Sequence, residues 1–466
     1  MAAQEALSSR ADDPAVHLAL ACALIELDRR EEAITSISRA AVLAANRPAL
    51  LAQIGDVAAN AQAVAAAEEH YRAALALDPD AIGATLGLGK LLERTNRLDD
   101  LAALLANNSR AELALLRARL LQRRGQLAES LEIVRAQPAE GDLAEYHQLL
   151  GELTDRLGEP IVAFEAFAQA NRERAASPSC DLASAQRYRE MIAALTARLT
   201  PAWYASWSSP APPCDNRSPA FVFGMPRSGT TLIDTMLMGH PDTVVLEEEP
   251  VIQRVMDAAA PRERLPQLTG PEIQALRRVY FDAVEQFSPG PVGKRLIVDK
   301  FPLGLVAAPL LHRLFPDARI VFVERHPCDV VLSCFFTAFR LNPGTTNFLD
   351  LTDAARLYHL VLTYWQRVRE VLPLATTVVR YETLVAQPEA VLRELAAFIG
   401  LTWNDRLTAS GANAAERSFI GSPSYAQVAE AVYHRSAGRW RRYRVQLEPV
   451  LPILAPWVER MGYDLD

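Results

Sequence analysis

A short polar loop between an apolar run and a helical stretch is the first place where this sequence could bind an anion. Residues 220–225 read AFVFGM, and after the loop the apolar pattern resumes as LIDTMLMGH. The amide N–H groups of such a loop, and of the helix that starts after it, point at one spot that suits a phosphate. The loop consists of Pro226, Arg227, Ser228, Gly229, Thr230 and Thr231.

The spacing from Gly224 to Gly229 is that of a Walker A loop, but the lysine of that motif is missing. Thr230 stands at its position, and Arg227 supplies a cation inside the loop instead. The residues therefore leave three interpretations open. The loop could be an anion site of another kind, the phosphate loop of a degenerate magnesium-dependent ATPase or kinase, or a turn that binds no ligand.

The elements that must position this loop alternate between short apolar runs and helical patterns. After the run at 220–225 come RLIVDK at 295–300, RIVFVER at 319–325 and TTVVRYE at 376–382, each followed by a helical segment. This alternation predicts a mostly parallel sheet with helices on both faces. Ligands of such sheets bind at the carboxyl ends of the strands, so we expect the functional residues directly after the apolar runs.

The first 175 residues repeat a helical pattern. A small residue is followed twelve positions later by another small or apolar residue, and the leading positions advance by 34, 34, 29 and 33 residues. This resembles the tetratricopeptide repeat, a helix–turn–helix unit of about 34 residues in which small residues let the helices approach. An ordinary alanine-rich bundle is the alternative. The pairs are Ala21 with Ala33, Gly55 with Ala67, Gly89 with Leu101, Ala118 with Ser130, and Gly151 with Ala163.

Length and composition limit the classes of protein. The chain has 466 residues, half of them apolar and 22% charged, which excludes disorder for most of it and predicts more than one domain. A net charge of −8 disfavours a general nucleic-acid binder. Five scattered cysteines without a C-x-x-C pair argue against a disulfide framework or a zinc site. Without a signal peptide or a long apolar run, we expect a cytoplasmic protein that has no membrane partner.

A change in amino-acid composition and hydrophobic periodicity marks the domain boundaries. We expect a repeat solenoid over residues 1–175, a connecting helix with a Pro/Ser-rich linker over 176–217, and an α/β domain over 218–466.

The loop then points to a family. The run GMPRSGTT resembles the 5′-phosphosulfate loop of sulfotransferases, in the arginine-containing form of tyrosylprotein sulfotransferases and of bacterial tetratricopeptide–sulfotransferase fusions. With the repeats, the resemblance covers nearly the whole chain. It implies an α-helical tetratricopeptide solenoid followed by a P-loop-like α/β sulfotransferase domain. It also implies 3′-phosphoadenosine 5′-phosphosulfate (PAPS) as the donor, with no metal required.

The same resemblance assigns roles to residues after the other strands. Arg325 ends an apolar run and Ser333 follows eight residues later, as in the family's 3′-phosphate motif at a helix start. A guanidinium and a hydroxyl suit a dianionic phosphate. The acidic run 246–249 resembles the segment with the proposed general base, which the count from Pro226 puts at Glu248, with Glu247 next. Lys300, in Asp-Lys-Phe-Pro, resembles the lysine that contacts the transferring sulfate.

Three further matches lie in the C-terminal part. Ser424 in SYAQV would contact the sulfate, Arg439 in GRW the 3′-phosphate, and Tyr381 in YETL lies in an element near the cofactor. The chain departs from related fusions at residues 429–431, where Ala-Glu-Ala replaces Arg-Gln-Pro and the one basic residue is missing. The resemblance therefore supports no contact there.

The expected reaction is transfer of the PAPS sulfuryl group to a hydroxyl, with Glu248, Lys300, Arg227 and Ser424 as the catalytic set. A tyrosine of a peptide or protein is the favoured acceptor, because the loop and the acidic run most resemble the protein-tyrosine branch. A solenoid also offers a concave surface for a polypeptide. A saccharide or small-molecule hydroxyl is the alternative acceptor. A scaffold whose transferase-like domain only senses the nucleotide is the alternative from another class of protein.

Overall fold

The chain divides into two compact units in the computed structural model, which describes residues 12–26, 29–106, 108–137, 142–207, 218–288, 290–409 and 437–465. One unit holds Met1–Asp142 and Glu152–Gly158, and the other holds Leu143–Gly151 and Glu159–Asp466. The division passes through helix α10 (Leu143–Arg156). None of the described helices combines the length and hydrophobicity that a membrane-spanning segment needs.

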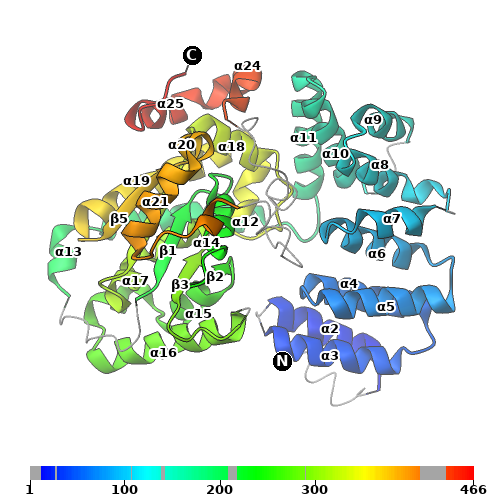
Figure 1. Cartoon of the computed structure of the whole chain (residues 1–466), viewed down its shortest axis with the longest axis horizontal. Helices are drawn as coiled ribbons and strands as arrows, with labels where there is room; N and C mark the ends of the chain where they lie inside the picture. Colours follow the sequence, from blue (N-terminus) through cyan, green and yellow to red (C-terminus); the bar gives the residue numbers. More distant parts are fainter. Residues whose placement is uncertain are drawn as a thin grey trace. The chain divides into compact units, whose positions relative to one another are not determined.

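The first unit is built from consecutive pairs of helices, coloured blue to cyan in Figure 1. Its helices are α2 (Pro14–Glu26), α3 (Arg30–Leu43), α4 (Pro48–Asn60), α5 (Val64–Leu77), α6 (Ile82–Arg94), α7 (Leu98–Leu105), α8 (Ala114–Arg123) and α9 (Leu127–Ala136), with a 3₁₀ turn, η1 (Ala111–Leu113), before α8.

Small residues at the predicted spacing hold the helices of each pair together. In α8 and α9, the buried Ser130 donates a hydrogen bond of 2.7 Å to the carbonyl oxygen of Ala118. In α4, a Cβ added to Gly55 would lie 2.6 Å from the ring of Tyr71, which is 2% exposed. The same ring lies against Gly87 of the following pair. One large side chain thus fills the space that small residues leave in two successive pairs.

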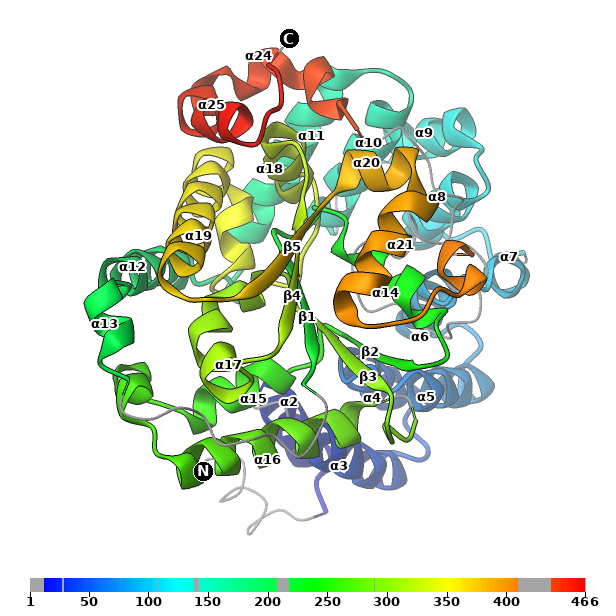
Figure 2. The same ribbon diagram turned by 60° about the vertical axis from the view of Figure 1, so that its left-hand side comes forward.

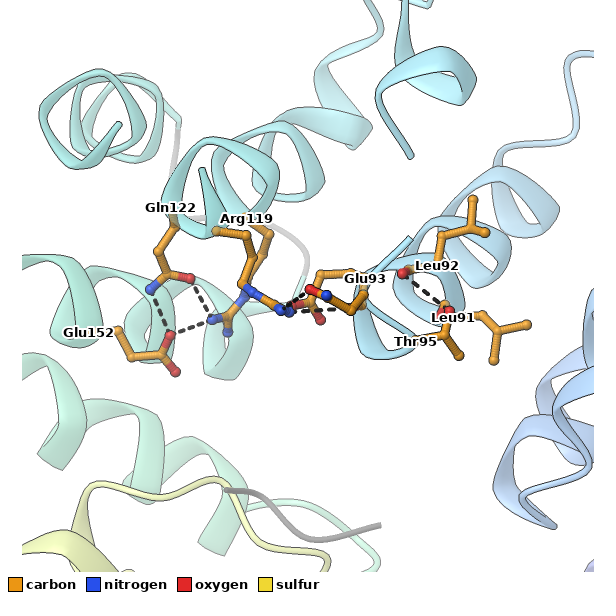
Figure 3. A network of polar contacts seen from close by, with 9 residues as sticks. Leu91, Leu92, Glu93, Thr95, Arg119, Gln122 and Glu152 are labelled. Atoms are coloured by element: carbon orange, nitrogen blue, oxygen red, sulfur yellow. Dashed lines mark hydrogen bonds and ion pairs between the residues drawn. The ribbon is translucent and has the colours of Figure 1, made fainter. Parts of the chain in front are cut away.

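Polar contacts also tie one helix pair to the next. Arg123 pairs with Glu93, which is buried at the end of α6. Arg119 pairs with Glu152, and the Gln122 amide donates to the same carboxylate at 2.9 Å (Figure 3). The partners of each contact lie 30 to 33 residues apart in the sequence, so these bonds act between successive helix pairs.

A parallel sheet forms the centre of the second unit, as the sequence predicts; its five strands are the four predicted apolar runs and one further strand, Thr243–Glu247, that the sequence analysis did not predict. The strands are β1 (Ala220–Gly224), β2 (Thr243–Glu247), β3 (Leu296–Lys300), β4 (Arg319–Glu324) and β5 (Ala375–Arg380). They lie in the order β2-β3-β1-β4-β5, and every neighbouring pair is parallel. All carboxyl ends therefore lie at one edge of the sheet.

Helices cover both faces of the sheet (Figures 1 and 2). On β1, Phe221 and Phe223 face one apolar core, whereas Ala220 and Val222 face another. The α-helices of this unit are α11 (Pro160–Ala175), α12 (Leu182–Arg198), α13 (Pro201–Ala205), α14 (Thr230–Met238), α15 (Val251–Ala258), α16 (Gly270–Phe287), α17 (Ala308–Leu314), α18 (Pro327–Phe335), α19 (Leu351–Val371), α20 (Tyr381–Ala386), α21 (Pro388–Ile399), α24 (Arg444–Leu447) and α25 (Leu451–Arg460). The 3₁₀ helices are η2 (Arg262–Gln267), η3 (Pro302–Ala307), η4 (Thr345–Leu349), η5 (Asp405–Thr408), η7 (Arg439–Tyr443) and η8 (Glu448–Val450).

Helix α11 packs within the second unit, although the sequence assigns residues 1–175 to one solenoid. Its Phe167 stacks on Phe336 with ring centroids 4.1 Å apart, and its Asn171 donates to the Phe335 carbonyl at 2.8 Å. The predicted boundaries at residues 175 and 217 stay predictions.

The chain order places the switch point of the sheet between β1 and β4. Helix α14 follows β1 and packs into one core, whereas α18 follows the adjacent β4 and packs into the other. In open α/β sheets, ligands bind where the helices leave neighbouring strands toward opposite faces. The loop after β1 and the segment after β4 meet at this point.

Candidate active site

The loop after β1 has a backbone that few residues can adopt. Gly229 has φ of +108°, and a Cβ added there would lie 2.6 Å from the ring of Tyr381. Arg227 also lies in the left-handed region, with φ of +67°. That conformation costs a non-glycine residue about 1–2 kcal/mol, which the surrounding packing must offset. The loop turns sharply into α14, whose first N–H groups have no partner inside the helix.

Three predicted phosphate ligands meet beside this loop. The Arg227 Nε donates to the hydroxyl of Ser333 at 3.2 Å, and Arg325 donates to the carbonyl oxygen of Arg227 at 2.9 Å. The Arg325 guanidinium lies over the ring of Tyr381, 4.7 Å from its centroid. The structure therefore brings together Arg227, Arg325, Ser333 and Tyr381 from four elements.

One detail of the predicted 3′-phosphate motif is wrong. Ser333 lies in the second turn of α18, not at its start, because the helix begins at Pro327 directly after the β4 segment. The hydroxyl still faces the loop, since it accepts the hydrogen bond from Arg227.

Lys300 ends β3 and is completely buried. Its Nζ lies 2.8 Å from Glu248 Oε1, 3.1 Å from Asp234 Oδ2 and 3.5 Å from Glu247 Oε1. Burial by itself lowers the pKa of Lys300, but the carboxylates of Asp234 and Glu248 outweigh it and raise the pKa above its ordinary value. The lysine is therefore an ammonium ion at neutral pH.

The acidic run follows β2, next to the strand that carries Lys300. Glu247 pairs in register with Lys300, and its side chain is 9% exposed. Glu248 has φ of +55°, and its N–H donates to the Lys300 carbonyl at 2.8 Å. Its side chain is 37% exposed while it contacts the lysine. Of these two glutamates, Glu248 is thus the one that an acceptor from solution reaches more readily.

Asp234 is the member of this group that the sequence analysis missed. It lies in α14, one turn after the loop, and is fully buried. A single carboxylate in the otherwise apolar stretch LIDTMLM was the available signal, because a buried charge needs a partner.

A second buried carboxylate, Asp299, precedes Lys300 on β3. The hydroxyl of Tyr280 donates to it at 3.2 Å. Burial, together with the charge of Glu249, raises the pKa of Asp299 to about 7 despite that hydrogen bond. Asp299 therefore changes charge near neutral pH.

The segment with Arg439 is anchored to α18. The carboxylate of Asp329 accepts from the N–H groups of Gly438 at 2.7 Å and Trp440 at 2.8 Å. Arg439 starts η7, and its guanidinium lies 5.0 Å from the centroid of Phe336. Ser424 lies outside the described residues. Among the described residues, no group of three His, Cys, Asp or Glu side chains has the arrangement of a metal site.

The sequence of this chain is similar to those of several known proteins. An uncharacterized protein of Aquifex aeolicus (strain VF5) is 28% identical over 259 residues, which are 51% of this chain and 32% of that protein. Protein-tyrosine sulfotransferase 1 of Danio rerio is 27% identical over 264 residues, 52% of this chain and 72% of that protein. The chain thus spans less than two thirds of the length of the Aquifex relative.

Among solved structures, the sulfotransferase domain of the Synechococcus PCC 7002 olefin synthase aligns with a TM-score of 0.40 and 21% identity. The alignment covers 55% of this chain and all of that domain. Residues 219–405, which contain β1 to β5 and the phosphate loop, match the sequence profile of the sulfotransferase family. Over these residues the chain is therefore similar to the sulfotransferase family.

Proposed function

We propose that this domain transfers the sulfuryl group of PAPS to a hydroxyl acceptor. The observation that carries the proposal is the contact of 2.8 Å between the carboxylate of Glu248 and the ammonium of Lys300. This pair lies at the carboxyl edge of the sheet. Lys300 also contacts Asp234, which lies in α14 one turn after the loop that follows β1. A carboxylate that accepts a proton and a cation that faces developing negative charge are the two groups that the transfer needs.

The residues beside the loop fit the two phosphate groups of PAPS. The loop amides and Arg227 would hold the 5′-phosphate, and Arg325 with Ser333 would hold the 3′-phosphate. Arg325 is 6% exposed and Ser333 7% exposed, so both would bind an anion with little competition from water. Tyr381 lies against Arg325 and Gly229, which limits where the guanidinium and the loop can move.

The chemistry divides between donor and protein. When bound, PAPS supplies a sulfuryl group whose bond to the 5′-phosphate oxygen breaks as the acceptor oxygen bonds to sulfur. Glu248 takes the hydroxyl proton, which increases the nucleophilicity of the acceptor oxygen. Arg227, Lys300 and the loop amides stabilise the negative charge on the phosphate oxygen that leaves. Arg439, and Ser424 outside the described residues, are further candidates for donor contacts.

A tyrosine of a peptide or protein is the acceptor that we favour. In support, the Danio rerio relative is named a protein-tyrosine sulfotransferase. The helix pairs of the first unit also fit a tetratricopeptide solenoid, which could engage an extended polypeptide. A saccharide or small-molecule hydroxyl is the second candidate.

Mass spectrometry after incubation with PAPS tests the function and the acceptor together. Tyrosine peptides, saccharides and phenols would be offered separately, and we expect the mass of one sulfate to be added to tyrosine peptides. Addition to saccharides alone would move the acceptor to the second candidate. Binding of PAPS without transfer to any class would favour a nucleotide-sensing scaffold, and phosphate transfer from ATP would favour the kinase interpretation.

A further inference from the structure

Lys300 carries one positive charge but lies close to three carboxylates. Its buried ammonium faces Asp234 from α14, Glu247 at the end of β2, and Glu248 directly after that strand. The exposed fractions of these side chains differ: 0% for Asp234, 9% for Glu247 and 37% for Glu248. The three acids are therefore not equivalent, because water screens the charge of Glu248 most and that of Asp234 least.

Asp234 also has a polar neighbour within its own helix. The hydroxyl of Thr235 lies 3.1 Å from Asp234 Oδ1 and 2.8 Å from the carbonyl oxygen of Thr231. Both threonines belong to α14, the helix that begins at the phosphate loop. The contact with Asp234 consequently ties the ammonium of Lys300 to the element that positions the loop.

The proposed reaction removes one of the three charges at the critical moment. When Glu248 takes the proton of the acceptor, it becomes neutral and no longer balances Lys300. Asp234, at 3.1 Å and without contact with solvent, still faces the ammonium. It keeps the ammonium protonated and at the same place while charge builds on the leaving oxygen.

We propose that Asp234 is a positioning residue of the transfer, acting through Lys300; this inference rests on the proposed function. Asp234 holds the lysine so that Glu248 is free to act as a base. Without Asp234, the two glutamates alone would balance Lys300, and protonation of Glu248 would leave the buried ammonium with only Glu247 as a close counter-ion.

The test compares Asp234→Asn and Asp234→Glu with the wild-type full chain, using PAPS and an acceptor that the wild type sulfates. In Asp234→Asn we expect kcat to fall by about 10²-fold, the effect of misplacing a reacting group by about 1 Å. Binding of adenosine 3′,5′-bisphosphate should change by less than about threefold, because the lost interaction acts in the transition state. Asp234→Glu should recover a large part of kcat, since it restores the charge.

The pH profile separates positioning from a merely structural role. The groups that face Lys300 among the described residues are Asp234, Glu247 and Glu248, and loss of one anion lowers the pKa of a buried ammonium. The alkaline limb of kcat should therefore move down by at least about one pH unit in Asp234→Asn. The matched control is Asp299→Asn. Asp299 precedes Lys300 in the sequence and is also buried, but its carboxylate accepts a hydrogen bond from Tyr280. The alkaline limb of this variant should not move.

The outcomes distinguish the two proposals. Asp234→Asn that binds the bisphosphate and keeps the wild-type rate and alkaline limb overturns the positioning role. If Asp234→Asn does not fold, Asp234→Glu carries the test: a variant that folds and binds the bisphosphate but loses about 10²-fold in kcat, although its charge is restored, overturns it as well. A wild-type chain that transfers sulfate to no acceptor overturns the proposed function instead.

Discussion

Replacing Glu248 by glutamine removes the basicity of one side chain and little else. Glutamine has the same shape, and its oxygen can still accept a hydrogen bond from Lys300 across the 2.8 Å contact. Because the carboxylate addresses the acceptor and not the nucleotide, the affinity for adenosine 3′,5′-bisphosphate should stay nearly unchanged.

The expected loss of rate follows from general-base catalysis, which contributes about 10² to 10⁴-fold. At about 1.36 kcal/mol for each factor of ten, this raises the barrier by about 2.7 to 5.4 kcal/mol. Glu247→Gln should lower the rate by less than about tenfold. The Glu247 carboxylate lies farther from Lys300 than that of Glu248 and is shielded from solvent, so an acceptor hydroxyl reaches it less readily. Glu249→Gln serves as a third variant in the same run of acids.

The assay measures initial rates of sulfate transfer at saturating PAPS for the three variants side by side. Calorimetry with the bisphosphate checks that each variant still binds. A wild-type rate in Glu248→Gln would remove this residue from the mechanism. A collapse in Glu247→Gln alone would move the base by one position and leave the transferase proposal intact.

Five further outcomes are expected. Arg325→Met should reduce the preference for adenosine 3′,5′-bisphosphate over the 5′-monophosphate by about 10- to 150-fold in calorimetry, because a charge-assisted hydrogen bond of about 1.5–3 kcal/mol is lost; an unchanged preference refutes its phosphate role. Turnover should survive EDTA, and a loss that magnesium restores would favour the kinase interpretation. Gly87→Ala should destabilise the first unit by about 1–3 kcal/mol, because the methyl group overlaps Tyr71. Gly83→Ala on the same helix meets no atom within 4 Å and should stabilise it by about 0.5–1 kcal/mol in thermal unfolding. Asp299, with its pKa raised to about 7, holds its proton in the folded state at pH values where the unfolded chain has lost it. Its contribution to stability is therefore full below about pH 4 and lost as the pH rises to about 7, at most about 1.4 kcal/mol per pH unit. Asp299→Asn should flatten that slope in chemical denaturation, and an unchanged slope contradicts the assignment.

Local patterns in the sequence were enough to predict the parallel sheet and the loop between β1 and α14. An apolar run followed by a glycine-containing turn and a helical pattern specifies a strand, loop and helix without reference to the rest of the chain. The pairs of small residues likewise encode helix packing, since Gly55 has room only for a hydrogen atom beside Tyr71. The family resemblance of GMPRSGTT then selected Arg325, Ser333 and Lys300 as residues to inspect.

The environment of each selected residue depended on contacts between distant segments. Nothing in the run of three glutamates tells which one is exposed, because this follows from the left-handed turn at Glu248 and its hydrogen bond to the β3 backbone. The sequence placed Ser333 at a helix start, whereas α18 presents it in the second turn.

Asp234 shows the same limit most clearly. In the sequence alone, burial of Asp234 in an apolar helix would cost free energy that no neighbour offsets. Lys300, at a strand end, looks like a charge that faces solvent. Only the packing of α14 against the sheet brings the two within 3.1 Å in the protein interior. There each charge offsets the desolvation of the other, which a one-dimensional pattern cannot express because the pairing depends on distance in space.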